Sequence, residues 1–190
     1  MLVEIELPDL EGATKALEKS PELCDWAITR TLNDVAASGK AAGTEVIFTR
    51  YYFESQGPVQ RGIKVKPTSS PRMPSVIRFE GTRFPLKQFL PSATLEGIDF
   101  MEIRGQSSSL AQAFGAIMKY GFGIFKRAPE AGRYPVRSIT GLSIANMARE
   151  STEIMPEMTK HINEQLVKRL KFWVGEAKLG HKEKYERRAP

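Results

Sequence analysis

Two stretches at opposite ends of this chain carry apolar residues at the three- and four-residue spacing of a long helix. The first runs from Cys24 to Val46, directly after Ser20-Pro21-Glu22. Ser followed by Pro and an acid is typical of a helix start, because the first turn lacks hydrogen-bond partners and carries partial positive charge. The second stretch runs from Ile154 to Val174. The fold must therefore bury one apolar face on each of two long helices.

The first helix is rich in small residues along its middle, between Ala36 and Gly43. Side chains of this size allow another backbone or a large side chain to approach the helix axis closely. We expect a tightly packed neighbour there. Gly57-Pro58 is predicted to end this helix.

Short segments that favour strands lie at the start of the chain and fill it between the two helices. They are Leu2–Leu7, Ile63–Lys66, Ser75–Glu80, Phe84–Leu90, Gly97–Arg104, Ala113–Lys119, Gly121–Lys126 and Tyr134–Ile139. The sequence therefore predicts an α+β fold: one mostly antiparallel sheet packed with the two long helices, with extended terminal arms over residues 1–19 and 176–190.

The length of 190 residues indicates one domain, here residues 1–177, followed by a basic mobile tail over residues 178–190. The net charge of +6 is unevenly placed. Residues 1–60 hold 5 basic and 10 acidic side chains, and residues 61–190 hold 23 and 12. This division suits self-association between unlike surfaces as well as contact with nucleic acid.

The single cysteine, Cys24, excludes an internal disulfide and fits folding in a reducing cytoplasm. The acidic start, with Glu4 and Glu6, does not suit a signal peptide. No apolar run has the length of a membrane span, so we expect no membrane partner.

Patterns for catalysis are weak, and we expect no enzyme, no cofactor and no metal site. The two histidines, His161 and His181, have no partner at a metal-ligand spacing, and His161 is expected on a solvated helix face. A metal-dependent nuclease would use the acids Glu80, Asp99 and Glu102 with the cation Arg104. Asp99 and Glu102 would point to opposite faces of a regular strand, which disfavours that interpretation.

Two segments separated by a loop predict a hairpin of two strands: Gly121–Arg127 and Arg133-Tyr134-Pro135-Val136. We expect Ile124 and Val136 on one face of it, with Arg127 and Arg133 flanking the loop. Gly141-Leu142-Ser143 then turns the chain into a short helix that ends near Arg149.

This run resembles the tail-completion family of long-tailed phages and prophages, the minor tail protein Z type. The resemblance is strongest from Ala113 to Met147. It extends to Ala27–Thr31 in the first helix, to the basic passage Val59–Val65, and to Met155-Pro156 together with the last amphipathic helix.

The resemblance implies a structural virion protein at the tail or neck, assembled in the host cytoplasm. Such a subunit would complete the head-proximal end of the tail as a ring, sixfold by the resemblance. Its partners would be copies of itself and the tail tube, the tail terminator or the head-tail connector, with non-specific contact to DNA in the channel. Candidate interface residues are Arg127, Arg133 and Tyr134, which could also merely brace the hairpin.

A second interpretation remains open. A basic nucleic-acid-binding protein of DNA packaging or repair would also carry the clusters around Lys64, Lys126 and Lys168. The two interpretations predict different behaviour, because the first requires self-association and the second requires salt-dependent duplex binding.

Overall fold

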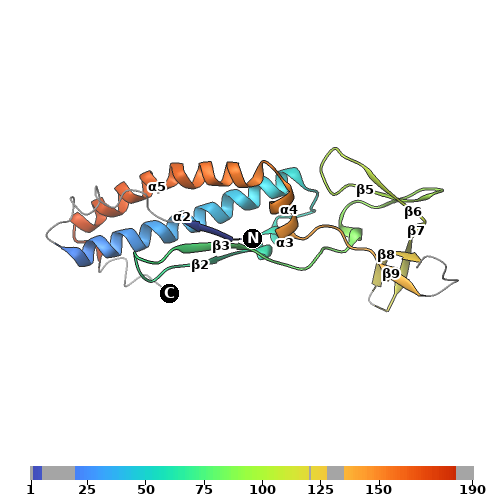
Figure 1. The fold of residues 1–190 in the computed structure, drawn as a ribbon, viewed down its shortest axis with the longest axis horizontal. Coiled ribbons are helices and arrows are strands. Elements are labelled where there is room, and N and C mark those ends of the chain that lie inside the picture. Colours follow the sequence, from blue (N-terminus) through green and yellow to red (C-terminus); the bar gives the residue numbers. More distant parts are fainter. Residues whose placement is uncertain (1, 6–19, 120, 128–134, 183–190) are drawn as a thin grey trace.

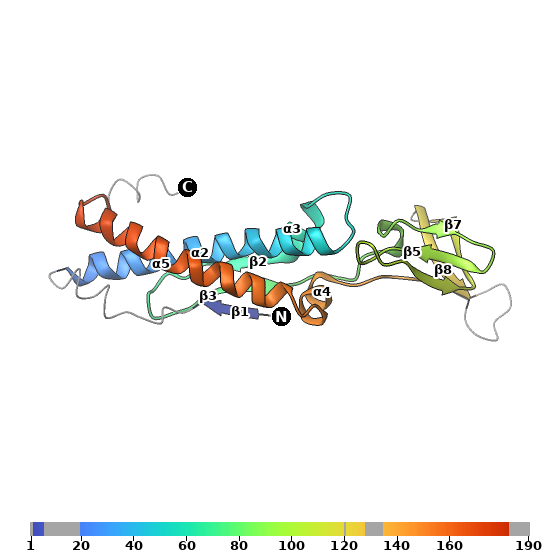
Figure 2. The ribbon, with the colours of Figure 1, turned by 90° about the horizontal axis from the view of Figure 1, so that it is seen from above.

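The computed structural model describes residues 2–5, 20–119, 121–127 and 135–182. The chain forms an elongated α+β molecule (Figures 1 and 2). A helical body, residues 2–5, 20–80 and 143–182, occupies one end. A β lobe, residues 86–138, occupies the other, and the segments 81–85 and 139–142 connect the two.

Two long helices dominate the body, as the apolar spacing predicts. Helix α2 spans Pro21–Arg50 and helix α5 spans Ile154–Lys178, and they pack along each other. The prediction that Gly57-Pro58 ends the first helix is wrong. Helix α2 stops at Arg50, and Gly57-Pro58 instead begins a short helix, α3 (Gly57–Gly62), because Pro is suited to the first turn of a helix.

The small residues of α2 allow its neighbours to approach closely. A Cβ atom at Gly39 would lie 2.8 Å from Ile77 Cδ1 and 3.0 Å from Ile162 Cγ1. A Cβ atom at Gly43 would lie 2.9 Å from Met158 Sδ. Both α5 and the strand that carries Ile77 therefore pack on the middle of α2, which confirms the tightly packed neighbour.

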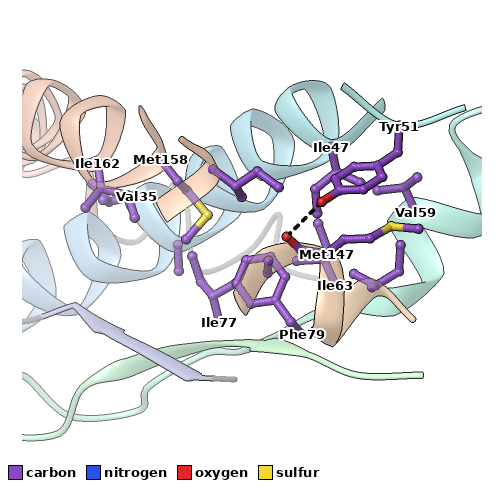
Figure 3. Packing of buried hydrophobic residues seen from close by; sticks show 14 of the residues in the cluster. Val35, Ile47, Tyr51, Val59, Ile63, Ile77, Phe79, Met147, Met158 and Ile162 are labelled. Atoms are coloured by element: carbon purple, nitrogen blue, oxygen red, sulfur yellow. Dashed lines mark hydrogen bonds between the residues drawn. The ribbon is translucent and has the colours of Figure 1, made fainter. Parts of the chain in front are cut away.

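The remaining helix, α4 (Ile144–Glu150), begins where the sequence predicts a short helix. Its N-cap Ser143 accepts a hydrogen bond from the Asn146 N–H through its hydroxyl, at 3.2 Å. The Tyr51 hydroxyl donates to the Met147 carbonyl at 3.4 Å, which ties α4 to the end of α2 (Figure 3).

Within the described residues, the strands form three antiparallel sheets of three strands each, rather than the one sheet predicted. The first sheet, in the body, has the order β1 (Leu2–Ile5), β3 (Ser75–Phe79), β2 (Ile63–Lys66). The other two, in the β lobe, are β4 (Ser92–Ala93), β5 (Gly97–Phe100), β6 (Ser108–Ala111) and β7 (Ala113–Met118), β8 (Gly121–Arg127), β9 (Val136–Ser138).

One predicted strand is wrong, and it marks the break between these sheets. Residues 84–90 form a single 3₁₀ turn at Leu86–Gln88 instead of a strand. Pro85 precedes that turn and has no N–H to give to a ladder. Leu86 and Phe89 are buried, so the turn supplies core side chains to the joint rather than a strand to a sheet.

The two connecting segments pair with each other between body and lobe. Phe84 N–H donates to the Leu142 carbonyl at 3.2 Å, and Gly141 N–H donates to the Phe84 carbonyl at 2.8 Å. The rings of Phe53, Phe84 and Phe89 pack edge to face beside this pair, with centroids 5.2 to 6.5 Å apart. The paired segments and the aromatic cluster therefore attach the lobe to the body.

The first sheet lies along α2, below the two long helices in Figure 1. Ile63 and Ile77 are fully buried on the helix side of the sheet, together with Phe79 (Figure 3). Cys24 is buried on α2, as expected of a small apolar side chain.

The expected arms are only partly tested. Residues 2–5 of the first arm form an edge strand, and the last helix includes residues 176–178 of the second, so neither of these pieces is an arm. Residues 6–19 and 183–190 lie outside the described part of the chain.

Candidate assembly surfaces

Of the three predicted interface residues, only Arg127 is described. It ends β8, where it is paired with Val136 of β9, and its guanidinium lies 5.3 Å from the ring centre of Phe114. This contact braces the hairpin, and the side chain remains exposed. Arg133 and Tyr134 lie outside the described residues, as does the loop between the strands.

The register of β8 and β9 corrects the expected faces. Val136 is opposite Arg127, and Ile139 N–H donates to the Ile124 carbonyl at 2.9 Å. Because side chains alternate along a strand, Ile124 and Val136 point to opposite faces. Ile124 is buried on the face that it shares with Ile139, so the sequence correctly predicts the hairpin but not its inner side.

Strands β7 and β8 form a second hairpin that is apolar on both faces. On one face Ile117 is opposite Phe122, and these side chains are 83% and 47% exposed. On the other face Phe114 lies beside Phe125, with ring centroids 6.3 Å apart. Ile117 and Phe122 are thus exposed on one face and Met118 on the other. Large apolar side chains in contact with solvent are typical of an interaction site.

The rings of this hairpin cover glycines, which explains its composition. A Cβ atom at Gly115 would lie 2.9 Å from the Phe122 ring, and one at Gly123 would lie 2.9 Å from the Phe125 ring. Aromatic rings folded over glycines in a strand shield the backbone and fix the register. The hairpin is thus ordered by its own side chains and still presents apolar surface.

A groove of about 760 Å³ lies between the C-terminal half of α2, the first turns of α5 and the turn after β5. Its apolar lining comes from Ala42, Val46 and Ile103, and its other lining residues are polar or charged: Glu45, Thr49, Arg50, Arg104, Gln106, Glu153, Glu157 and His161.

Several of the charged groove residues are held in place. Arg50 forms an ion pair with Glu153. Arg104 donates through Nε to the Phe48 and Tyr51 carbonyls, both at 3.2 Å, and its guanidinium lies over the rings of Phe48 and Tyr52. Within the described chain, Glu45 and Glu157 form no ion pair.

His161 is not on a solvated face, contrary to the sequence-based expectation. It is half-buried, and its Nε2 lies 2.8 Å from Ser38 Oγ across the two long helices. The sequence does contain a signal for the groove: Glu153, Glu157 and His161 recur every four residues, one position before the apolar residues Ile154, Met158 and Ile162. A polar stripe beside an apolar one is common on helices, so it does not by itself predict a groove.

The residues of the nuclease hypothesis serve different structural roles. Glu102 accepts the Leu142 N–H at 2.9 Å, and Glu80 pairs with Lys64 at 3.1 Å. Asp99 is opposite Ser92 and Ser109 within its sheet. Among the described residues no group of three or more His, Cys, Asp or Glu side chains could hold a metal ion.

A basic face lies on the first sheet. Lys64 of β2 is directly opposite Arg78 of β3, and Lys66 follows two residues later on the same strand and face. All three side chains are exposed. This face could contact phosphates without reading bases.

The chain matches no protein-family model, no curated protein and no solved structure. No helix in the described ranges is long and apolar enough to cross a membrane.

Proposed function

We propose that this chain is a structural phage or prophage virion protein that completes the head-proximal end of the tail. It would assemble with copies of itself into a ring, sixfold by the family resemblance, and join the tail tube or its terminator to the head-tail connector. On this proposal the protein is not an enzyme, takes no cofactor, and acts in the virion after assembly in the host cytoplasm.

One observation carries the proposal: the β7–β8 hairpin presents apolar side chains on both faces at the end of an elongated molecule. Large exposed apolar patches on a monomer are usually covered by another protein. The family resemblance supports the identity of that protein, because its strongest part, Ala113–Met147, includes this hairpin.

The test is to measure the mass of the purified protein by light scattering, alone and mixed with tail tubes of the encoding phage or prophage. We expect association that rises with concentration, and tubes capped at one end in negative-stain images. A monomer at every concentration that leaves tube ends bare would contradict the proposal.

The second candidate, a nucleic-acid-binding protein of DNA packaging or repair, is favoured by the basic face of Lys64, Lys66 and Arg78. It predicts duplex affinity that falls steeply with salt, and Lys64→Gln with Lys66→Gln would reduce the slope by roughly two. Tight duplex binding without tube capping would replace the first proposal with this one.

A further inference from the structure

The hairpin of β7 and β8 has a consistent chemistry along its length. From Ala113 to Arg127 the sequence contains no acidic residue, and its described cations are Lys119, Lys126 and Arg127. Both faces are apolar toward the turn, where Ile117, Met118 and Phe122 are exposed.

The groove has a complementary chemistry. Its lining combines an apolar strip, Ala42, Val46 and Ile103, with three glutamates, Glu45, Glu153 and Glu157, and two arginines, Arg50 and Arg104. Arg104 is held against the Phe48 and Tyr51 carbonyls. Since Arg50 pairs with Glu153, the carboxylates of Glu45 and Glu157 are the ones left to meet external cations among the described residues. An apolar, positively charged segment fits such a surface.

The hairpin cannot fill the groove of its own molecule in this arrangement. The groove lies at the joint between body and lobe, where the C-terminal half of α2 and the first turns of α5 meet the turn after β5, whereas the β7–β8 hairpin reaches the outer end of the lobe (Figures 1 and 2). The paired connecting segments and the buried Phe89 hold the lobe in that direction. An occupant with the chemistry of this hairpin must come from another molecule.

We propose that the β7–β8 hairpin of one copy docks in the α2–α5 groove of a second copy. The contact joins two different surfaces, so each copy offers one hairpin and one groove, and repetition builds a closed ring or an open filament. The inference rests on the self-association in the proposed function and specifies the surfaces that produce it. It places Arg127 at the interface and assigns its partners, the groove glutamates.

A charge exchange between the two surfaces tests the proposal. One variant carries Lys126→Glu and Arg127→Glu, and the other carries Glu45→Lys and Glu157→Lys. Glu153 is left unchanged because its ion pair with Arg50 belongs to the fold. Each variant alone should self-associate at least tenfold more weakly than the parent in light scattering. An equimolar mixture should recover dimers, because the reversed hairpin of the first meets the reversed groove of the second.

Circular dichroism of each variant checks that the helices are intact before association is compared. Variants that are folded and associate as strongly as the parent would overturn the proposal. So would a mixture of folded variants that shows no recovery.

Disulfide trapping gives a second, independent test. Copies with Phe122→Cys are mixed with copies carrying Glu157→Cys under mild oxidation, and we expect a cross-linked dimer. Cys24 is buried and is expected to stay unreactive. The matched control uses Leu95→Cys, a fully exposed lobe position outside the hairpin, in place of Phe122→Cys. No dimer, or an equal yield from the Leu95 control, would overturn the proposal.

The outcomes separate this inference from the proposed function. Tubes that are capped by a protein without the hairpin-to-groove cross-link would leave the function standing and refute the inference. A cross-link with tube ends left bare would support the inference and refute the proposed function. A parent protein that stays monomeric up to about 100 µM, above the concentrations at which specific protein contacts usually form, would refute both.

Discussion

At the scale of single residues, the tight packing around the middle of α2 depends on a glycine. Gly39 sits in the interior of α2, where glycine is normally unfavourable by about 1 kcal/mol relative to alanine. Glycine is nevertheless required here, because Ile77 and Ile162 occupy the space that a larger side chain would need. The residue type is therefore set by the neighbours of the helix and not by the helix itself.

We expect Gly39→Ala to lower the free energy of unfolding by about 1–2 kcal/mol, because the added methyl overpacks the core by more than the gain in helix propensity. The matched control is Gly175→Ala in α5, where no atom lies within 4 Å of the new Cβ. That substitution should raise the free energy of unfolding by up to about 1 kcal/mol. Urea unfolding of both variants measures the difference, and equal effects would contradict this account of Gly39.

Glu102 is a residue with an unusual environment at the joint between body and lobe. Burial is the main factor that raises the pKa of its carboxyl, and the charge of Glu150 acts in the same direction. The hydrogen bond from Leu142 N–H acts in the opposite direction but is outweighed. At neutral pH the charged carboxylate of Glu102 therefore lowers the stability of the folded state, because burial disfavours the charge.

We expect Glu102→Gln to raise the melting temperature at pH 7, by less than about 4 °C for a chain of this size. Gln keeps an acceptor for Leu142 N–H and removes the partly buried charge. Since the folded pKa is raised, the cost of the charge is present at neutral pH and disappears as the pH falls through that pKa. Near pH 4 the advantage of the variant should vanish, and thermal scans at both values test this. An advantage that grows as the pH falls would contradict the assignment.

At the scale of elements, the two long helices were predictable because each has a long amphipathic repeat. The buried side of α2 nevertheless moves from the predicted Ala42 and Val46 to Gly43 and Ile47. The shift follows from the second neighbour of α2, the β1–β3–β2 sheet, which a one-dimensional pattern does not reveal.

The sheets were less predictable than the helices. Most segments that became strands had been recognised, but β4 (Ser92–Ala93) and β6 (Ser108–Ala111) had not. The division into three sheets depends on the turn at Pro85 and on pairing between distant segments. The groove was missed for the same reason, since its residues come from three elements that meet only in the folded chain.

Helix α5 offers a direct comparison between its buried and exposed sides. Ile162 is buried against Gly39, whereas Val167 is exposed. Ile162→Ala should lower the free energy of unfolding by about 2–4 kcal/mol, because it leaves a cavity between the helices. Val167→Ala should change it by less than about 0.5 kcal/mol. Both changes in the free energy of unfolding are read from the shift of the denaturant midpoint, provided that the slope of the transition is unchanged. A large cost at Val167 would indicate that another molecule covers this face of α5.

At the scale of the whole molecule, body and lobe are joined through a small set of contacts. The segments near Phe84 and Leu142 pair with each other beside the ring of Phe89, and residues 102–104 of the lobe pair with residues 50–52 at the end of α2. Both tryptophans, Trp26 and Trp173, lie in the body and pack against each other with ring centroids 5.3 Å apart. The two ends of the molecule therefore have separate centres of packing linked by one aromatic cluster.

We expect Phe89→Ala to loosen the lobe more than the body. The substitution removes a fully buried ring, at a cost of about 3–5 kcal/mol to the contacts around it. Hydrogen exchange followed by mass spectrometry should show faster exchange in β5–β8 and nearly unchanged exchange in α2 and α5. Leu95→Ala, at an exposed lobe position, is the control. Equal acceleration in the long helices would mean that the molecule opens as one unit.

The pairing of Phe84 with Leu142 means that the chain leaves the body and returns to it at adjacent points. In terms of evolution, everything between these two residues behaves as a cassette. A longer or shorter segment could be exchanged there while the helices and their sheet keep their geometry, provided that it replaces the contacts that residues 102–104 make with residues 50–52. Lineages that share the body could thus change the partner they recognise by replacing the lobe alone.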